Sequence, residues 1–69
     1  MTVRTVVARN LRRLRVDCGL SQEDLADRDG VDRTYISSLE REQYAASIDM
    51  LEKLANALGF DPAEFFRRD

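Results

Sequence analysis

Side chains able to hydrogen-bond with nucleic acid recur along the segment from Arg33 to Arg41. An arginine offers a forked donor that fits guanine or phosphate, and a threonine offers a hydroxyl and a methyl group to a base edge. Helical spacing puts these polar side chains on one face, whereas Ile36 and Leu39 fall on another. We expect four residues of the polar face to contact DNA bases: Arg33, Thr34, Ser37 and Ser38.

This polar segment is predicted to be the second helix of a pair that spans residues 20–41 and is joined by a tight turn. Ser21 is a predicted N-cap with an acidic residue three positions later, which is the pattern of a capping box. Asp32 is the N-cap predicted for the second helix, and Gly30 is expected to end the first helix because glycine tolerates positive φ. A connection of about four residues is typical of a helix-turn-helix.

Three further helices are predicted around this pair. A first helix from about Thr5 to Cys18 carries an apolar stripe that ends in Cys18, so the cysteine is expected in the core. A fourth helix follows the N-cap Ser47 and ends at Gly59, and a short fifth helix begins after Asp61. The sequence therefore predicts an all-α fold, a compact five-helix bundle in which residues 1–69 form a single domain.

The charged residues of the chain are unevenly distributed. Its 69 residues carry a formal net charge of −2, which by itself argues mildly against a nucleic-acid partner. Residues 4–15, however, hold five arginines and no acid, while residues 23–32 hold five acids and one arginine. This distribution predicts a basic face toward DNA and an acidic back.

Several function classes lack their usual residues in this chain. It has no histidine, a single cysteine and no phosphate-binding glycine loop. We therefore expect no enzyme activity, no metal site and no cofactor. No apolar run reaches the length of a membrane span and no signal peptide is visible, which favours a cytoplasmic protein.

As a set, the motifs resemble those of the lambda-repressor-like helix-turn-helix family, also called the XRE or phage-repressor type. The match covers about residues 6–66 and rests on the runs LSQEDLA, GVDRTYISSLER and IDMLEKLANALGFDPAEFF. The resemblance implies a transcriptional regulator that binds a palindromic operator in double-stranded DNA as a homodimer. Phage repressors, antitoxins and restriction–modification controller proteins share the pattern, and the run from Tyr35 to Arg41 makes the controller type attractive.

The resemblance also implies roles for residues outside the base-contacting set. It implies an ion pair between Arg15 and Glu40 that fixes the first helix against the third. Gln22 stands in the first turn of a helix, where free backbone N–H groups favour an anion. We expect contacts with DNA phosphates from four residues: Gln22, Tyr35, Arg41 and Gln43.

Two residues depart from the family pattern. Asp29 stands where a small or apolar residue is usual, and its carboxylate is expected at the surface near a helix C-terminus. Glu42 stands where glycine is common. This position therefore needs either a left-handed non-glycine residue or a different helix ending.

The C-terminal phenylalanines predict an interaction surface. Adjacent Phe65 and Phe66 cannot share one narrow helix face, so one is expected in the core and the other exposed. We assign the dimer interface to Phe60, Phe65 and Phe66, with local burial of both neighbours as the alternative. A second function also stays open, in which the acidic stretch 23–32 and this tail bind a protein partner, as in an antitoxin or a coactivator.

Overall fold

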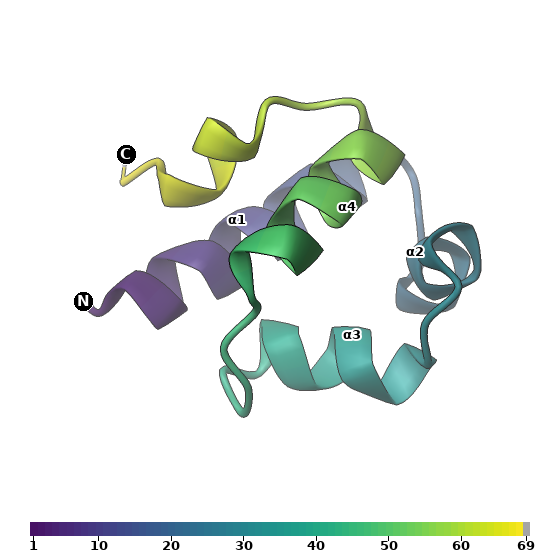
Figure 1. Cartoon of the computed structure of the whole chain (residues 1–69), viewed down its shortest axis with the longest axis horizontal. Helices are drawn as coiled ribbons and strands as arrows, with labels where there is room; N and C mark the ends of the chain where they lie inside the picture. Colours follow the sequence, from purple (N-terminus) through teal and green to yellow (C-terminus); the bar gives the residue numbers. More distant parts are fainter. Residues whose placement is uncertain (69) are drawn as a thin grey trace.

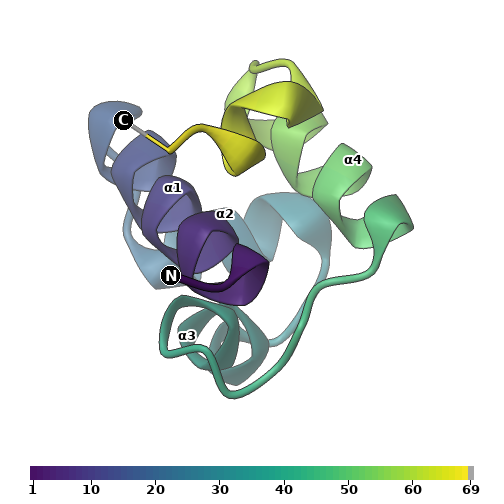
Figure 2. The same ribbon diagram turned by 90° about the vertical axis from the view of Figure 1, so that its left-hand side faces the viewer.

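Figure 1 shows an arrangement of helices in which α3 lies beneath α1 and α4. The computed structural model describes residues 1–68. Within them, the elements are α1 (Val3–Asp17), α2 (Gln22–Asp29), α3 (Arg33–Glu40), α4 (Ile48–Leu58) and the 3-10 helix η1 (Pro62–Phe66). The view turned by 90° shows η1 packed beside α1, with α3 below them (Figure 2). None of the helices in this described part is long and apolar enough to cross a membrane.

Side-chain caps fix where the helices of the motif begin. The capping box predicted at Ser21 is present: Ser21 Oγ accepts from the Asp24 N–H at 3.0 Å, and the Ser21 N–H donates to Asp24 Oδ2 at 3.0 Å. Asp32 caps α3 and Ser47 caps α4, as predicted. Gly30 ends α2 with a φ of 65°, the left-handed conformation that glycine adopts without strain.

Both ends of α1 differ from the prediction. The helix begins at Val3 because Thr2 Oγ1 accepts the Thr5 N–H at 3.2 Å and caps it earlier than expected. At the other end, Cys18 is the exposed C-cap, and its thiol donates to the Leu58 carbonyl at 3.5 Å. The prediction that Cys18 lies in the core is therefore wrong, because the helix ends before the apolar stripe reaches it.

One hydrophobic core joins the four α-helices and η1. α1 contributes Leu11 and Leu14, as its apolar stripe predicts, and η1 contributes the fully buried Phe65. The other core side chains come from α2, α3 and α4: Leu25, Ala26, Ile36, Leu39, Leu51, Leu54, Ala55 and Leu58. Burial of this kind contributes about 25 cal/mol per Å² of apolar surface. Packing of Ile36 and Leu39 in this core anchors one side of α3 and leaves its other side exposed to solvent.

The last element is a 3-10 helix, so the prediction of a fifth α-helix is wrong. η1 has only five residues, and its Glu64 N–H donates to the Asp61 carbonyl three residues back at 2.9 Å. Asn10 Nδ2 of α1 donates to the carbonyls of Phe65 at 2.9 Å and Arg67 at 2.7 Å. These carbonyls are satisfied by a side chain of α1, so a short tight segment suffices to bury Phe65.

Asp29 lies in the interior, contrary to the surface position expected from the sequence. It is 5% exposed, on a helix that packs against both α3 and α4. Its Oδ2 has no hydrogen-bond partner among the described residues. Burial raises the pKa of the Asp29 carboxyl above its ordinary value, and the positive charge of Lys53 opposes that rise.

Candidate nucleic-acid interface

α3 presents a polar face to solvent on the side opposite its buried Ile36 and Leu39. Four residues make up this polar face and line a shallow cleft of about 160 Å³: Arg33, Thr34, Ser37 and Arg41. Arg33, Thr34 and Arg41 are exposed, and Ser37 is half-buried. The structure therefore brings together three of the predicted base-contacting residues and one of the predicted phosphate-contacting residues.

Ser38 does not belong to the polar face of α3. It is 4% exposed, since it lies about 100° of helix rotation beyond Ser37. The loop after α3 also turns back at this point, where the Gln43 N–H donates to the Ser38 carbonyl at 2.9 Å. A side chain covered by its own chain does not reach a base edge, so the structure contradicts the predicted base contact of Ser38.

A buried ion pair holds α3 against α1. Arg15 Nε donates to Glu40 Oε2 at 2.7 Å, and Arg15 Nη2 donates to Glu40 Oε1 at 3.1 Å. Arg15 Nη1 donates to the Leu20 carbonyl at 2.7 Å. The side chains of Arg15 and Glu40 are only 11% and 4% exposed. The ion pair implied by the family resemblance is present, and Glu40 adds little negative charge to the polar face.

Gln22 joins this ion pair from the first turn of α2. Its Nε2 donates to Glu40 Oε1 at 3.2 Å, and the residue is half-buried. Backbone N–H groups at a helix start lack helical partners and attract anions. The Glu40 contact therefore fixes the Gln22 amide beside α3 while leaving it further hydrogen-bonding capacity.

The loop after α3 contains a strained residue that is tied to α1. Glu42 has a φ of 65°, and no other non-glycine residue in the described chain has a positive φ. Thr5 Oγ1 of α1 donates to Glu42 Oε1 at 2.5 Å. Of the two backbone possibilities open from the sequence, the left-handed one is present. The glycine-to-glutamate departure marks the site, but nothing in the sequence indicates that Thr5 reaches it.

Two tyrosines pack together beside this loop. The ring centroids of Tyr35 and Tyr44 lie 6.5 Å apart at an interplanar angle of 33°, a favourable aromatic arrangement. Tyr35 is half-buried, whereas Tyr44 is 60% exposed. Gln43 is exposed next to Tyr44. The Tyr44 ring therefore packs on the protein through Tyr35.

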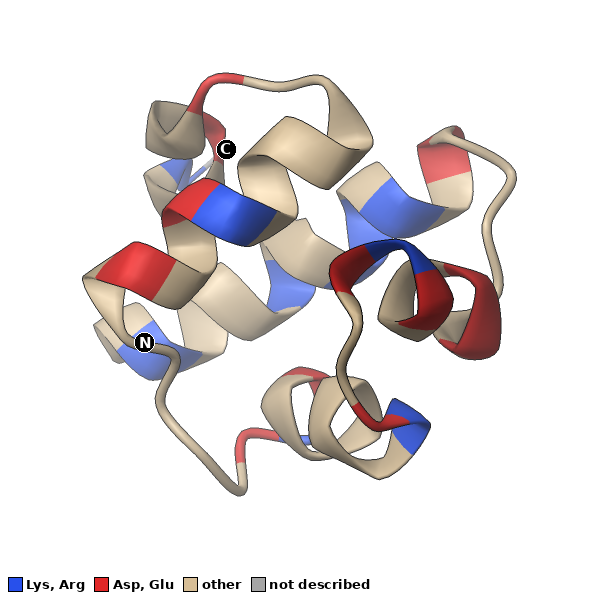
Figure 3. Ribbon diagram, turned by 45° about the vertical axis from the view of Figure 1, so that its right-hand side comes forward, with Lys and Arg blue, Asp and Glu red and all other residues tan. Residues whose placement is uncertain are grey.

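The acidic stretch lies beside α3. α2, which packs against α3, carries several red segments in Figure 3. Backbone N–H donors of Ser21 and Thr34 lower the pKa of the Asp24 and Asp32 carboxyls respectively, so both stay ionised at neutral pH. The acidic helix is therefore a direct neighbour of α3, and the basic face with an acidic back stays a prediction.

The geometry of α2 and α3 agrees with a known family. The helix-turn-helix family model matches residues 11–65. The chain belongs to the helix-turn-helix family. Its motif consists of α2 and α3, joined at Gly30, where the Val31 N–H donates back to the Ala26 carbonyl at 3.0 Å and closes the turn.

Known helix-turn-helix proteins resemble this chain over most of its length. A hypothetical transcription factor of Neisseria meningitidis serogroup B is 47% identical over 57 residues, covering 83% of this chain and 54% of that protein, so the chain spans about half of that relative. The restriction–modification controller protein C.AhdI from Aeromonas hydrophila has a crystal structure with a TM-score of 0.86 and 43% identity, covering 91% of this chain and 96% of that one. The controller protein C.Esp1396I, crystallised as a tetramer with its natural 35-base-pair operator, gives a TM-score of 0.85 at 33% identity, covering 96% of this chain and 87% of that one.

The three phenylalanines assigned to a dimer interface occupy different environments in this helix-turn-helix protein. Phe65 is fully buried in the core, so it is not available to a partner. Phe60 is half-buried and packs on the core, while Phe66 is 48% exposed. The expectation that one of the adjacent pair is buried and the other exposed is confirmed. The structure does not bring the three together on one surface.

Clusters of metal-binding residues are missing from residues 1–68 of this helix-turn-helix chain. No group of three or more His, Cys, Asp or Glu side chains is placed there to hold a metal ion. The polar cleft on α3 offers donors and hydroxyls but no carboxylate or sulfur ligand. The chemistry available at this face is therefore hydrogen bonding and charge attraction toward an anionic polymer.

Proposed function

We propose that this chain is a sequence-specific DNA-binding transcriptional regulator that acts as a homodimer on a palindromic operator. The exposed polar face of α3, on a helix anchored through the core by Ile36 and Leu39, is the observation that carries the proposal. Similarity to C.AhdI, which extends over 96% of that chain, supports the narrower role of a restriction–modification controller. The operator complex of C.Esp1396I supports double-stranded DNA as the partner.

In this proposal α3 enters the major groove with its N-terminal end first. Arg33 stands at the first helical position, where its forked guanidinium donates to O6 and N7 of a guanine. Thr34 offers its hydroxyl or its methyl group to the next base, and Ser37 reaches a base one turn along the helix. A bidentate contact of the Arg33 kind contributes about 1–3 kcal/mol of discrimination against the wrong base.

Contacts with phosphates would fix the register of α3 in the groove. Gln22 is held beside α3 by Glu40 and stands at the start of α2, where the helix dipole favours an anion. Arg41 and Gln43 would bind the backbone at the other end of α3, and Tyr35 would bind it from the first turn of α3. Each neutralised phosphate releases counterions, so affinity for any DNA should fall steeply as the salt concentration rises.

A palindromic operator follows from the twofold symmetry of a dimer. Two copies of α3 would meet successive major grooves about 34 Å apart, one helical turn of DNA. A regulator of this kind has to reach its operator, which supports a cytoplasmic location for the chain.

Selection from random double-stranded DNA tests the proposed function. The purified chain should enrich fragments containing two inverted copies of a short motif, with centres about one helical turn apart. Enrichment of no motif, in buffers of low and moderate salt, would contradict sequence-specific binding. That outcome, together with tight binding to a protein partner, would favour the antitoxin or coactivator alternative.

A further inference from the structure

An apolar groove of about 400 Å³ opens between the start of α1, the loop after α3 and the start of α4. Its floor is formed by small or buried side chains that include Ala8, Leu11 and Leu51. Four of the large hydrophobic side chains that the described chain exposes stand around it: Val3 (53%), Tyr44 (60%), Ile48 (84%) and Phe66 (48%). A cluster of exposed apolar side chains of this kind does not stabilise a monomer in water and is typical of an interaction site.

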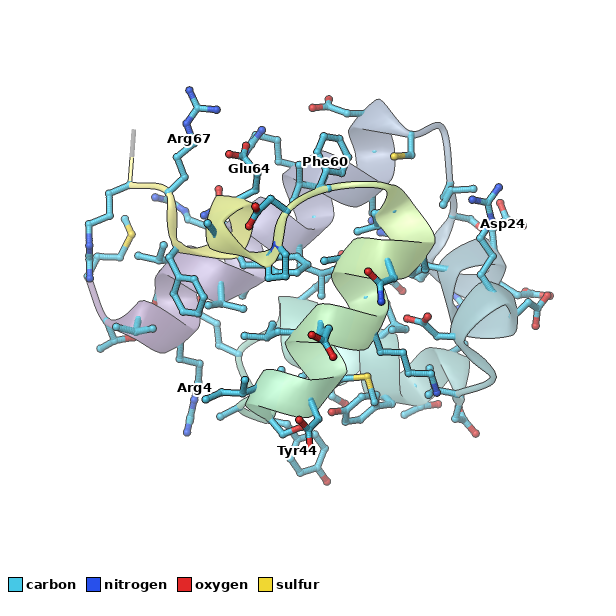
Figure 4. All side chains as sticks on the ribbon, turned by 45° about the horizontal axis from the view of Figure 1, so that its top comes forward. Arg4, Asp24, Tyr44, Phe60, Glu64 and Arg67 are labelled. Atoms are coloured by element: carbon cyan, nitrogen blue, oxygen red, sulfur yellow. The ribbon has the colours of Figure 1, made fainter. Side chains whose placement is uncertain are left out.

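We propose that this groove is the surface on which a second copy of the chain docks, an inference that rests on the proposed homodimeric regulator. The groove and its rim are called the Ile48 surface below. It differs from the interface assigned from the sequence, because Phe65 is buried and Phe60 lies elsewhere. Figure 4 shows Phe60 at the edge of the molecule opposite Arg4 and Tyr44, and both of these line the groove.

The shape of the Ile48 surface suits contact with an identical surface. A twofold interface places the same patch on both partners, so each patch must carry both a projection and a hollow. Ile48, 84% exposed at the first position of α4, is the projection, and the groove beside it is the hollow. A side chain the size of isoleucine from the partner fits a groove of about 400 Å³.

The charges around the Ile48 surface are also self-complementary. Arg4 is the charged residue among those that line the groove. Asp49 follows Ile48 in the exposed first turn of α4. Within residues 1–68, neither Arg4 nor Asp49 has an ion-pair partner. Twofold docking brings residues from opposite sides of one patch together, so the arginine of each copy can meet the aspartate of its partner.

Docking on the Ile48 surface leaves the polar face of α3 free. The groove borders the loop that follows α3, whereas Arg33 lies at the opposite end of that helix. A partner on this side therefore extends the molecule beyond the C-terminal end of α3.

The oligomeric state of an Ile48→Glu variant tests this docking surface. We expect sedimentation equilibrium to find a reversible dimer for the wild type and a dimer dissociation constant raised at least about tenfold by Ile48→Glu, because two carboxylates would be buried against apolar side chains. The variant should fold, since position 48 is highly exposed and an acid at a helix start is favoured by the dipole. Val16→Glu is the matched control, because Val16 is 56% exposed on α1 and does not line the groove.

Two results would overturn the assignment of the Ile48 surface. One is a dimer of Ile48→Glu as tight as that of the wild type and of Val16→Glu. The other is a wild-type chain that stays monomeric both free and on its selected DNA, which would point to a different occupant such as another protein. The first result leaves the outcome of selection from random DNA unchanged, so it separates failure of the docking surface from failure of the proposed function. The second result also contradicts the proposed homodimer, and selection should then enrich a single half-site instead of two inverted copies.

Discussion

Glu40 illustrates how a carboxylate is accommodated in a helix whose other side is the polar face that we propose contacts DNA. Its oxygens accept hydrogen bonds from Arg15 and Gln22, and its side chain is only 4% exposed. Desolvation offsets much of the attraction within such a buried pair, so its main contribution is orientation. We infer that this network sets the position of α3 relative to α1 and α2.

Asp29 predicts a pH dependence of stability. Burial raises the pKa of its carboxyl above the ordinary value of 3.8, so the folded state binds this proton more tightly than the unfolded chain does. The free energy of unfolding should therefore decrease as the pH rises from 3.8 through the raised pKa. Asp29→Asn should be more stable than the wild type near neutral pH, with a difference that shrinks as the pH falls.

Urea unfolding followed by circular dichroism across this pH interval measures the effect of Asp29→Asn. Asp27→Asn is the control, because Asp27 is exposed on the same helix. The difference in stability between Asp27→Asn and the wild type should not increase with pH. A variant Asp29→Asn that is less stable than the wild type near neutral pH would contradict a cost from the buried carboxylate.

At the residue scale, the sequence correctly predicts the roles of side chains that bond to residues only a few positions away. The caps Ser21, Asp32 and Ser47 are confirmed, since each cap involves residues only a few positions apart. The burial of Ser38 and Asp29 is not predicted by the sequence, because it depends on which segments cover these side chains. Periodicity places a side chain on a face, but not at the edge where a loop or a neighbouring helix closes over it.

The loop from Glu42 to Ala46 is the element that most needs the tertiary structure to explain it. A left-handed glutamate is unfavourable on its own, and the hydrogen bond from Thr5 holds it in place. The same loop lines the groove through Tyr44 and contacts α3 through the Tyr35 ring. It therefore joins the polar face of α3 to the Ile48 surface.

Glu42→Gly is expected to be more stable than Glu42→Ala. Both substitutions remove the hydrogen bond from Thr5, but only glycine relieves a left-handed backbone that costs an L-residue roughly 1–2 kcal/mol. Glycine loses part of this gain through the entropy of its unfolded state. A net difference of about 1 kcal/mol corresponds to about 4–8 °C in Tm for a domain of this size.

Thermal unfolding of the two Glu42 variants, followed by circular dichroism, measures this difference. Thr5→Val provides the complementary control, because it removes the hydrogen bond and leaves the strained residue in place. Thr5→Val, like Glu42→Ala, should have a lower Tm than the wild type. Equal melting temperatures for the glycine and alanine variants would mean that the backbone at position 42 carries no strain.

At the element scale, the sequence predicts the positions of the helices well, but it does not predict that the last element is a 3-10 helix. Hydrophobic periodicity and caps give α1 to α4 because those signals are local. η1 has the start signals of an α-helix, with Asp61 as cap and Pro62 following. The side chain of Asn10, far away in sequence, donates to the carbonyls of Phe65 and Arg67 at the end of this element, and no local pattern predicts those bonds.

At the scale of the whole molecule, the net charge of −2 conceals the local arrangement that matters for binding. Arg33 and Arg41 stand at the two ends of an exposed face, and the carboxylate of Glu40 between them is turned inward and paired. Residue types and helical spacing identify this face from the sequence, and the family resemblance supports it. The Ile48 surface was not identified, because its side chains come from both ends of the chain and from the loop between α3 and α4.

The central claim is that the polar face of α3 reads DNA sequence. Its most direct test is the ratio of affinities for the selected operator and for a scrambled duplex, measured at one fixed salt concentration for wild type, Arg33→Ala and Arg13→Ala. Arg13 is a matched control because its guanidinium contacts Asn10, on the side of α1 that binds η1.

We expect Arg33→Ala to lower this ratio roughly 5- to 150-fold, because it removes a contact with a base. This change corresponds to a loss of about 1–3 kcal/mol in the free energy of discrimination between the two duplexes. Arg13→Ala should leave the ratio within about twofold of the wild type, since a distant arginine does not discriminate between sequences. An unchanged ratio for Arg33→Ala, or an equal loss for both variants, would contradict recognition of DNA through this face.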